Sequence, residues 1–178
     1  MKNLIFIGIV CLLPISCLTS KKDLIKNNYI SVDYVTHKEG NSITCSSKQF
    51  EIEQLECKKQ DTYGEIMSNT QIEFSSESKA QIERDGGLLK VLENNLSKEN
   101  YDKLINRTSF EIGAVLNQDA IPSGYSFRMY NENMKDIVLS DVEINNIFNY
   151  ISSLKFVFIK KASGSFKVAA YYGYSLRK

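Results

Sequence analysis

The sequence predicts an α+β protein, in which an N-terminal antiparallel β unit precedes an α+β layer with helices on one face of an antiparallel sheet. Two patterns support this prediction. Apolar and polar residues alternate with period two in both halves of the chain, as is typical of strands. Apolar residues recur at spacings of three and four in 88–96 and 144–151, as is typical of amphipathic helices. The composition, 43% hydrophobic with 2 prolines in 178 residues, is that of a globular protein.

The first sixteen residues have the pattern of a secretory signal peptide. Lys2 precedes an apolar run over 4–15. This run is too short to span a bilayer, which takes about 20 helical residues, but it fits the apolar region of a signal peptide, about 7 to 15 residues long. We therefore expect residues 1–16 to be removed on export and exclude them from the fold.

Residues 13–17, Leu-Pro-Ile-Ser-Cys, resemble a bacterial lipobox. Ser16 is the small residue expected before the lipidated cysteine, while Pro14 stands where a lipobox has Leu, Val or Ile. The resemblance implies that Cys17 is acylated and that residues 17–28 tether the protein to membrane lipid, each buried CH₂ contributing about 0.8 kcal/mol. We expect an exported lipoprotein on the outer or inner membrane of a bacterial envelope. The alternative is a secreted or periplasmic soluble protein.

Two further cysteines, Cys45 and Cys57, remain in the expected mature chain. An even pair in an oxidising compartment predicts a disulfide, and the alternative is a pair of buried free thiols. No metal site is expected, because the pair lacks close His or Cys neighbours and the single histidine, His37, stands alone.

Residues 29–74 are expected to form the small β unit. Alternation begins at Tyr29, and further strands are predicted around 43–46 and 50–57, with a strand, loop and strand over 63–74. Because the two cysteines would then lie on neighbouring strands, a cross-strand bridge is sterically feasible. Residues 75–87 are polar, end in Gly-Gly and read as a linker or a short polar helix.

Residues 87–178 are expected to form the α+β domain. Helices are predicted over 88–96 and over 97–105, where Ser97 is a candidate N-cap, followed by a strand hairpin over 110–116 and 125–130. Ser140 and Glu143 have the spacing of a capping box and precede an apolar stripe. Strands over 154–158 and 166–176 complete the pattern.

Three segments of this half, LLKVLENNL (88–96), SFEIGAVLNQDA (109–120) and DVEINNIFNYISSLKF (141–156), together resemble the C-terminal domain of TonB. In that family a helix leads into a strand with an Asn-x-Asp-Gly turn, and a second strand, a helix and a closing strand follow. Asn117 and Asp119 match the turn, whereas Ala120 replaces the glycine, and Pro122 and residues 131–136 also depart from the pattern. The resemblance implies the fold only. TonB has a transmembrane anchor and a proline-rich linker, so energy transduction is not implied for this chain. The whole chain also looks like the small lipoproteins of unknown function that gram-negative bacteria encode.

The sequence predicts neither a catalytic set nor a cofactor. It has no G-x-S-x-G nucleophile motif and no phosphate-binding glycine loop, and one histidine makes a catalytic triad improbable. Carboxylate pairs such as Glu51 and Glu53 could perform acid–base chemistry, but a solvated strand face is the simpler interpretation. Removing Lys2 with the signal leaves equal numbers of basic and acidic residues, so no nucleic-acid partner is predicted.

The last strand carries the candidate interaction surface. Tyr171, Tyr172 and Tyr174 are distributed over both faces of this strand. Tyrosines are favoured in interfaces, and a terminal strand at a sheet edge can bind a protein partner by strand addition. The sequence therefore favours a non-catalytic binding or interaction module in the envelope. The alternatives are a hydrolase or isomerase that uses carboxylates and a purely structural envelope protein.

Overall fold

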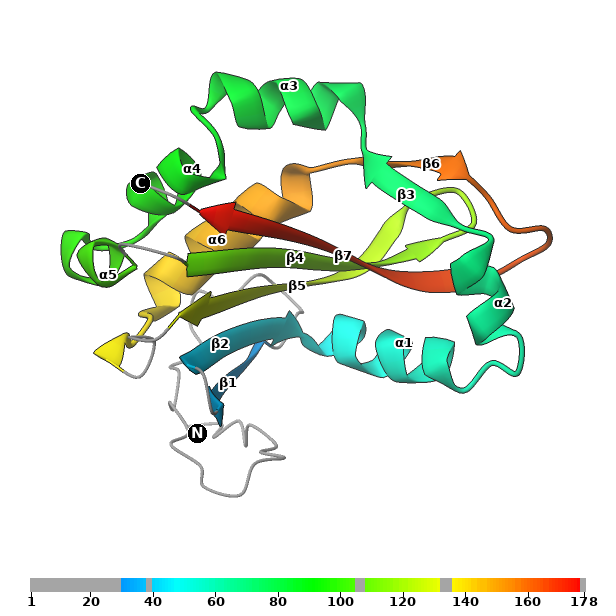
Figure 1. Ribbon diagram of the computed structural model, residues 1–178, viewed down its shortest axis with the longest axis horizontal. Coiled ribbons are helices and arrows are strands. Elements are labelled where there is room, and N and C mark those ends of the chain that lie inside the picture. The colour runs from blue at the N-terminus through cyan, green and yellow to red at the C-terminus, as the bar shows by residue number, and fades with distance from the viewer. Residues whose placement is uncertain (1–29, 38–39, 105–107, 132–135, 177–178) are drawn as a thin grey trace, which may run out of the picture.

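The computed structural model describes residues 30–37, 40–104, 108–131 and 136–176. Its main feature is a five-stranded sheet with the strand order β1-β2-β5-β4-β7 (Figure 1). Every neighbouring pair is antiparallel. The strands are β1 (Ile30–His37), β2 (Gly40–Ser47), β4 (Thr108–Asn117), β5 (Pro122–Asn131) and β7 (Lys167–Leu176).

A second, two-stranded sheet lies beside the main one. It pairs β3 (Gln71–Phe74) with β6 (Phe156–Lys160) in antiparallel orientation. Phe74 and Phe156 of this sheet contact Tyr172 on β7, with ring centroids 4.6 and 5.6 Å away. The small sheet is therefore attached to the main one through aromatic packing near β7.

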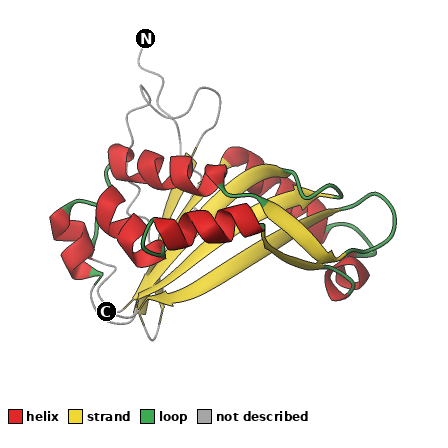
Figure 2. Cartoon of the chain, turned by 90° about the horizontal axis from the view of Figure 1, so that it is seen from above, coloured by secondary structure: helices red, strands yellow, loops and turns green. Residues whose placement is uncertain are grey.

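Helices lie on more than one side of the sheet (Figure 2). Their bounds are α1 (Lys48–Lys58), α2 (Tyr63–Ser68), α3 (Ser76–Arg84), α4 (Leu88–Asn95), α5 (Lys98–Lys103) and α6 (Asp141–Ser153). None of the helices in the described part of the chain has the length and apolar character that crossing a bilayer requires.

The larger core lies between one face of the sheet and α6 with α4. Residues at alternate strand positions point to this face, as the pleat of a sheet requires, and the cross-strand neighbours Cys45, Phe127 and Ile112 are all fully buried there. Phe127 packs on Phe148 of α6 with ring centroids 5.3 Å apart. The apolar stripe of α6 is thus buried against the sheet, as its spacing predicts.

The opposite face of the sheet is partly covered by α1. Phe50 of α1 forms a smaller cluster with Val115 and Ala169, whose side chains point away from the larger core. The helix comes so close to β5 that a Cβ on Gly124 would lie 2.4 Å from the Phe50 nitrogen. Glycine at this position is what lets α1 lie directly on the strand.

The α+β class and the antiparallel sheet are confirmed, while the strand prediction for 50–57 is wrong. This segment is α1, which begins at Ser47, whose hydroxyl accepts a hydrogen bond from the Phe50 backbone N–H. Phe50, Glu53 and Cys57 share the buried face of the helix. Apolar and polar residues alternate around Ile52, and this alternation predicts a strand. In the helix Ile52 points to solvent, so the alternation does not mark a buried face.

The structure also differs from the sequence prediction at residues 63–84 and in the predicted β unit. Residues 63–68 form a helix in place of a strand, and the polar segment after β3 forms α3, one of the two predicted alternatives. Within the described residues, the unit expected over 29–74 has no sheet of its own. Its strands β1 and β2 extend the sheet of the C-terminal half through β5, and β3 pairs with β6.

Helix α6 confirms the capping box that its sequence predicts. The Ser140 hydroxyl accepts from the backbone N–H of Glu143, and the Glu143 carboxylate accepts from the backbone N–H of Ser140. Leu139 and Ile144, which flank this box, are both buried and occupy the positions of a hydrophobic staple. The local signals at this helix start are therefore consistent with each other and with the tertiary packing.

Candidate functional site

The last strand, β7, forms one edge of the main sheet, and its register defines which backbone groups point outward. Ala169 of β7 hydrogen-bonds through its backbone to the Tyr63 hydroxyl on α2, away from β4. In an antiparallel pair, N–H and C=O of one residue point to the same side and successive residues alternate. Tyr171 and Gly173, which share the parity of Ala169, therefore direct their backbone polar groups outward.

A second contact in the sheet gives the same alternation independently. The backbone N–H of Tyr125 donates to Ser47 Oγ at 3.2 Å on the β2 side of β5. The backbone N–H and C=O of its neighbour Ser126 therefore point toward β4, where Ser126 pairs with Gly113. Gly113 in turn pairs with Tyr171, so the polar backbone groups of Tyr171 must point away from β4.

We call residues 171–175 of β7 the open edge. Within the described residues, β4 is the only other element whose backbone hydrogen-bonds this segment, and the outward side has no such partner. Unpaired N–H and C=O groups along a strand are a template for pairing with another extended chain. The open edge begins directly after Ala169 and Ala170, where the contact with Tyr63 ends.

The core face of the open edge carries an aromatic cluster. Tyr172 and Tyr174 lie on this face, and Phe74 stacks on them with ring centroids 4.6 and 6.5 Å away. Burial raises the pKa of Tyr172, and Tyr174 and Glu73 add to the rise. In the described part of the chain, the Tyr172 hydroxyl is buried without a hydrogen-bond partner.

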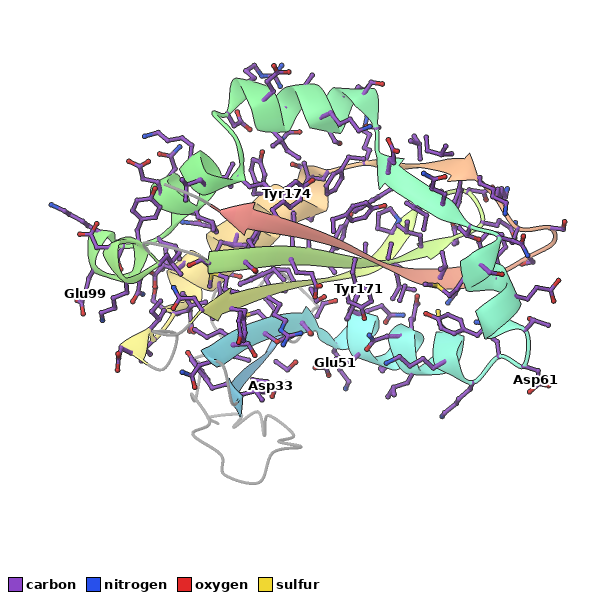
Figure 3. The ribbon with its side chains drawn as sticks, viewed as in Figure 1. Asp33, Glu51, Asp61, Glu99, Tyr171 and Tyr174 are labelled. Atoms are coloured by element: carbon purple, nitrogen blue, oxygen red, sulfur yellow. The ribbon has the colours of Figure 1, made fainter. Side chains whose placement is uncertain are left out.

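Tyr171 lies on the other face of β7, on the side of α1 (Figure 3). It is 44% exposed, and its ring meets the Phe50 ring edge to face with centroids 6.1 Å apart. The Gln54 side chain donates a hydrogen bond to its hydroxyl. Burial, with smaller effects from Tyr63 and Glu111, raises the pKa of Tyr171 to about 12, so this hydroxyl is neutral at physiological pH and remains a hydrogen-bond donor.

Gly173 leaves the centre of the open edge uncovered. A Cβ built at this residue would have no heavy atom within 4 Å, so glycine is not required there by packing. The structure thus places the three tyrosines of the sequence prediction around one accessible stretch of backbone.

Sequence reasoning missed Phe74 and Tyr63, because both reach β7 from segments remote in sequence and no local pattern indicates such a contact.

The two cysteines do not form the predicted disulfide. Cys45 lies on the core face of β2, whereas Cys57 lies on α1 in the cluster on the opposite face, and both are buried free thiols. The sheet separates the two sulfurs, and the strand assignment that made a bridge feasible does not hold for Cys57. Burial is the largest cause that raises the pKa of both thiols. Cys17, the predicted lipidation site, lies outside the described residues.

The carboxylates do not assemble into an acid–base pair. Glu51 and Glu53, considered together from the sequence, diverge on α1. Glu51 accepts a hydrogen bond from Ser31, while Glu53 is buried, accepts from Ser123 and pairs with Lys167 at 3.2 Å. Hydrogen bonds from Ser123 and the other partners of Glu53 outweigh burial and lower its pKa, which is the behaviour of a structural carboxylate rather than of a general acid. Among the described residues, no group of three His, Cys, Asp or Glu side chains could hold a metal ion.

Comparison with protein-family models, with curated proteins and with solved structures finds no match to this chain.

Proposed function

We propose that the protein is a non-catalytic binding module of an exported lipoprotein, and that it binds an extended segment of another protein by strand addition to β7. The observation that carries the proposal is the open edge, 171–175, whose outward backbone groups have no partner among the described residues. In strand addition, main-chain hydrogen bonds supply affinity and alternate side chains supply specificity.

The side chains around the open edge indicate what such a segment would contain. Residues on the core side of an added strand would lie near Tyr172, Tyr174 and Phe74. Residues on the other side would lie near Tyr171, which is exposed and carries a donor hydroxyl. A segment with aromatic or apolar residues at every second position, and polar residues between them, matches this surface best.

The proposed location rests on the sequence. Lys2, the apolar run over 4–15 and the pair Ser16-Cys17 support export and acylation of Cys17. The order of α4, β4, β5, α6 and β7, with α5 following α4 and β6 preceding β7, supports the proposed resemblance to the TonB C-terminal domain. Mass spectrometry of the mature N-terminus tests the anchor: an acylated Cys17 is expected, and an unmodified terminus beyond it would contradict the anchor.

A pair of substitutions at Gly173 tests the binding mode. Gly173→Pro removes one outward N–H and blocks an added strand, yet it removes no hydrogen bond to β4, because this N–H points away from that strand. Gly173→Ala is the matched control, since its methyl group would enter open space. Circular dichroism and thermal unfolding establish that both variants fold.

The assay is recovery of cross-linked proteins from envelopes with the wild-type chain and both variants as bait. A specific protein should be recovered by the wild type and by Gly173→Ala, and about tenfold less by folded Gly173→Pro, the change that corresponds to loss of about 1.4 kcal/mol. Equal recovery by all three chains would refute strand addition. No described contact favours the carboxylate-dependent enzyme, because Glu51 and Glu53 serve as separate structural acceptors.

A further inference from the structure

A polar pocket of about 400 Å³ lies away from the open edge, between α2 and the segment that connects β6 to β7. This volume is within the range of small-molecule sites, about 300–1,000 Å³. One wall is formed by α2, including Glu65, and the other by residues 160–166. The connection turns at Gly164, whose φ of 83° suits glycine.

The lining of the pocket carries opposite charges that do not neutralise each other. Glu65 belongs to α2, whereas Lys160 ends β6 and Lys161 follows it in the connecting segment. Within the described residues, no ion pair joins Glu65 to either lysine. A ligand in the pocket therefore meets both a carboxylate and ammonium groups.

One of these ammonium groups is held in position by α2 itself. Lys160 Nζ donates to Asn69 Oδ1 at 3.1 Å and lies 3.5 Å from the Ser68 carbonyl oxygen. An ammonium has three donors, so one remains for a ligand. A cation that is already oriented loses less conformational entropy when it binds an anion.

The pocket also has an apolar component. Ile66 and Phe166 line it, and both are largely buried. Phe166 is supported by Phe158, with ring centroids 5.7 Å apart in edge-to-face geometry. The apolar side chains give a ligand a rigid surface to contact, while Ser163 and Ser165 add hydroxyl groups at the rim.

From these features we infer that the pocket binds a small zwitterion with an apolar side chain, of the class of free amino acids. The ligand carboxylate faces Lys160 and Lys161, its ammonium faces Glu65, and its apolar part contacts Ile66 and Phe166. A simple anion would lie near the Glu65 carboxylate and leave it without a cation. A simple cation would lie near two lysine ammonium groups. This inference is independent of strand addition at β7.

The test compares three probes of similar shape by NMR titration of the full chain: L-leucine, 4-methylpentanoate and 3-methylbutylamine. L-leucine should bind about tenfold more tightly than either half-ligand, because each half-ligand lacks one charged contact, and tenfold corresponds to about 1.4 kcal/mol. Glu65→Gln and Lys161→Ala should each weaken L-leucine binding about tenfold. Glu65→Gln should also bring L-leucine close to the affinity of 4-methylpentanoate.

Matched controls separate the pocket from general surface charge. Glu77 and Lys155 form an exposed ion pair outside the pocket, and Glu77→Gln and Lys155→Ala should leave L-leucine binding unchanged. Gly173→Pro should also leave it unchanged, so failure of strand addition and failure of this inference are distinguishable. Equal affinity for L-leucine and 4-methylpentanoate, no binding of any probe, or equal weakening by Lys155→Ala would each overturn the inference.

Discussion

The carboxylate of Glu143 joins two helix starts, and its replacement by glutamine should destabilise the fold. Glu143 Oε1 accepts from the Ser97 backbone N–H at 2.7 Å and from Asn100 Nδ2 at 2.9 Å, at the start of α5. Glu143 Oε2 accepts from the backbone N–H and the hydroxyl of Ser140, both at 2.7 Å, at the start of α6. The residue is only 6% exposed, so water cannot readily replace these donors.

The expected cost of Glu143→Gln follows from the contacts that an amide cannot make. Glutamine keeps the size of the side chain but offers one acceptor oxygen, so its NH₂ group must face two of the four donors. Hydrogen bonds to a charged group contribute about 1.5–3 kcal/mol each, and each helix N-terminus adds about 0.3–1 kcal/mol for a nearby anion. Allowing for relaxation of the donors, we expect a loss of about 3 kcal/mol and a fall in Tm of roughly 6–12 °C.

The pH dependence distinguishes loss of charge from altered packing. Burial would raise the pKa of Glu143, but the hydrogen bonds from Ser97, Ser140 and Asn100 outweigh it and lower the pKa below its ordinary value. The folded state therefore binds the proton less readily than the unfolded state. The stability that Glu143 contributes is complete above its unfolded pKa and is lost as the pH falls through the lower, folded pKa.

Urea unfolding of both proteins between pH 7 and pH 3 measures this difference. The gap in unfolding free energy should be largest at pH 7 and shrink toward pH 3, where the wild-type carboxyl is increasingly protonated. Glu99→Gln is the control on α5, the helix whose start Glu143 contacts, because Glu99 is exposed (Figure 3) and its ion pair among the described residues is with Lys103 of the same helix. A Glu143→Gln effect no larger than that of Glu99→Gln, or a gap independent of pH, would refute the reasoning.

Three further predictions concern the hairpin turn, the close approach of α1 and the thiols. Ala120 has a φ of 58°, so Ala120→Gly should relieve backbone strain and raise stability by about 0.5–1 kcal/mol after the entropy of the unfolded glycine is counted; a lower Tm would contradict this. Gly124→Ala should lower stability by about 2 kcal/mol or more, since its Cβ would lie 2.4 Å from the Phe50 nitrogen, whereas Gly173→Ala should be close to neutral in the same denaturation assay. The two buried cysteines should react with a thiol reagent only after unfolding. If Cys45 and Cys57 stayed unreactive in the unfolded chain, the result would support the disulfide instead.

Much of the second half of the fold could be predicted because its signals are local. The capping box of Ser140 and Glu143 and the apolar stripe behind it lie within one helix, and the alternation in β4, β5 and β7 reflects the strand face that packs in the larger core. Asn117 also acts locally: its side-chain oxygen accepts from the backbone N–H of Asp119 at 2.9 Å and of Ile121 at 3.0 Å. The turn is therefore formed by the residues that predict it, with Ala120 in the left-handed region.

Helix α1 could not be predicted because its buried face is not apolar throughout. Glu53 occupies the centre of that face and is neutralised by Lys167 from β7, a contact that no local pattern indicates. Meanwhile Ile52 and Leu55 point to solvent. The apolar residues therefore lack the helical stripe that identifies α6, and Ser47, a residue type that is common at N-caps, was the one local sign of a helix start.

The same two helices that the sequence did not predict determine where β7 is open. Phe50 of α1 covers Ala169, and Tyr63 of α2 hydrogen-bonds the backbone of that residue. Beyond this point α1 reaches β7 only through the side chain of Gln54, which contacts the Tyr171 hydroxyl and leaves the backbone uncovered. The tyrosines could be identified from the sequence because three of them lie close together in the last predicted strand. Their position at the boundary between a covered and an open stretch of edge strand depends on packing from residues 48–68, and it is this boundary that makes strand addition at 171–175 a specific proposal.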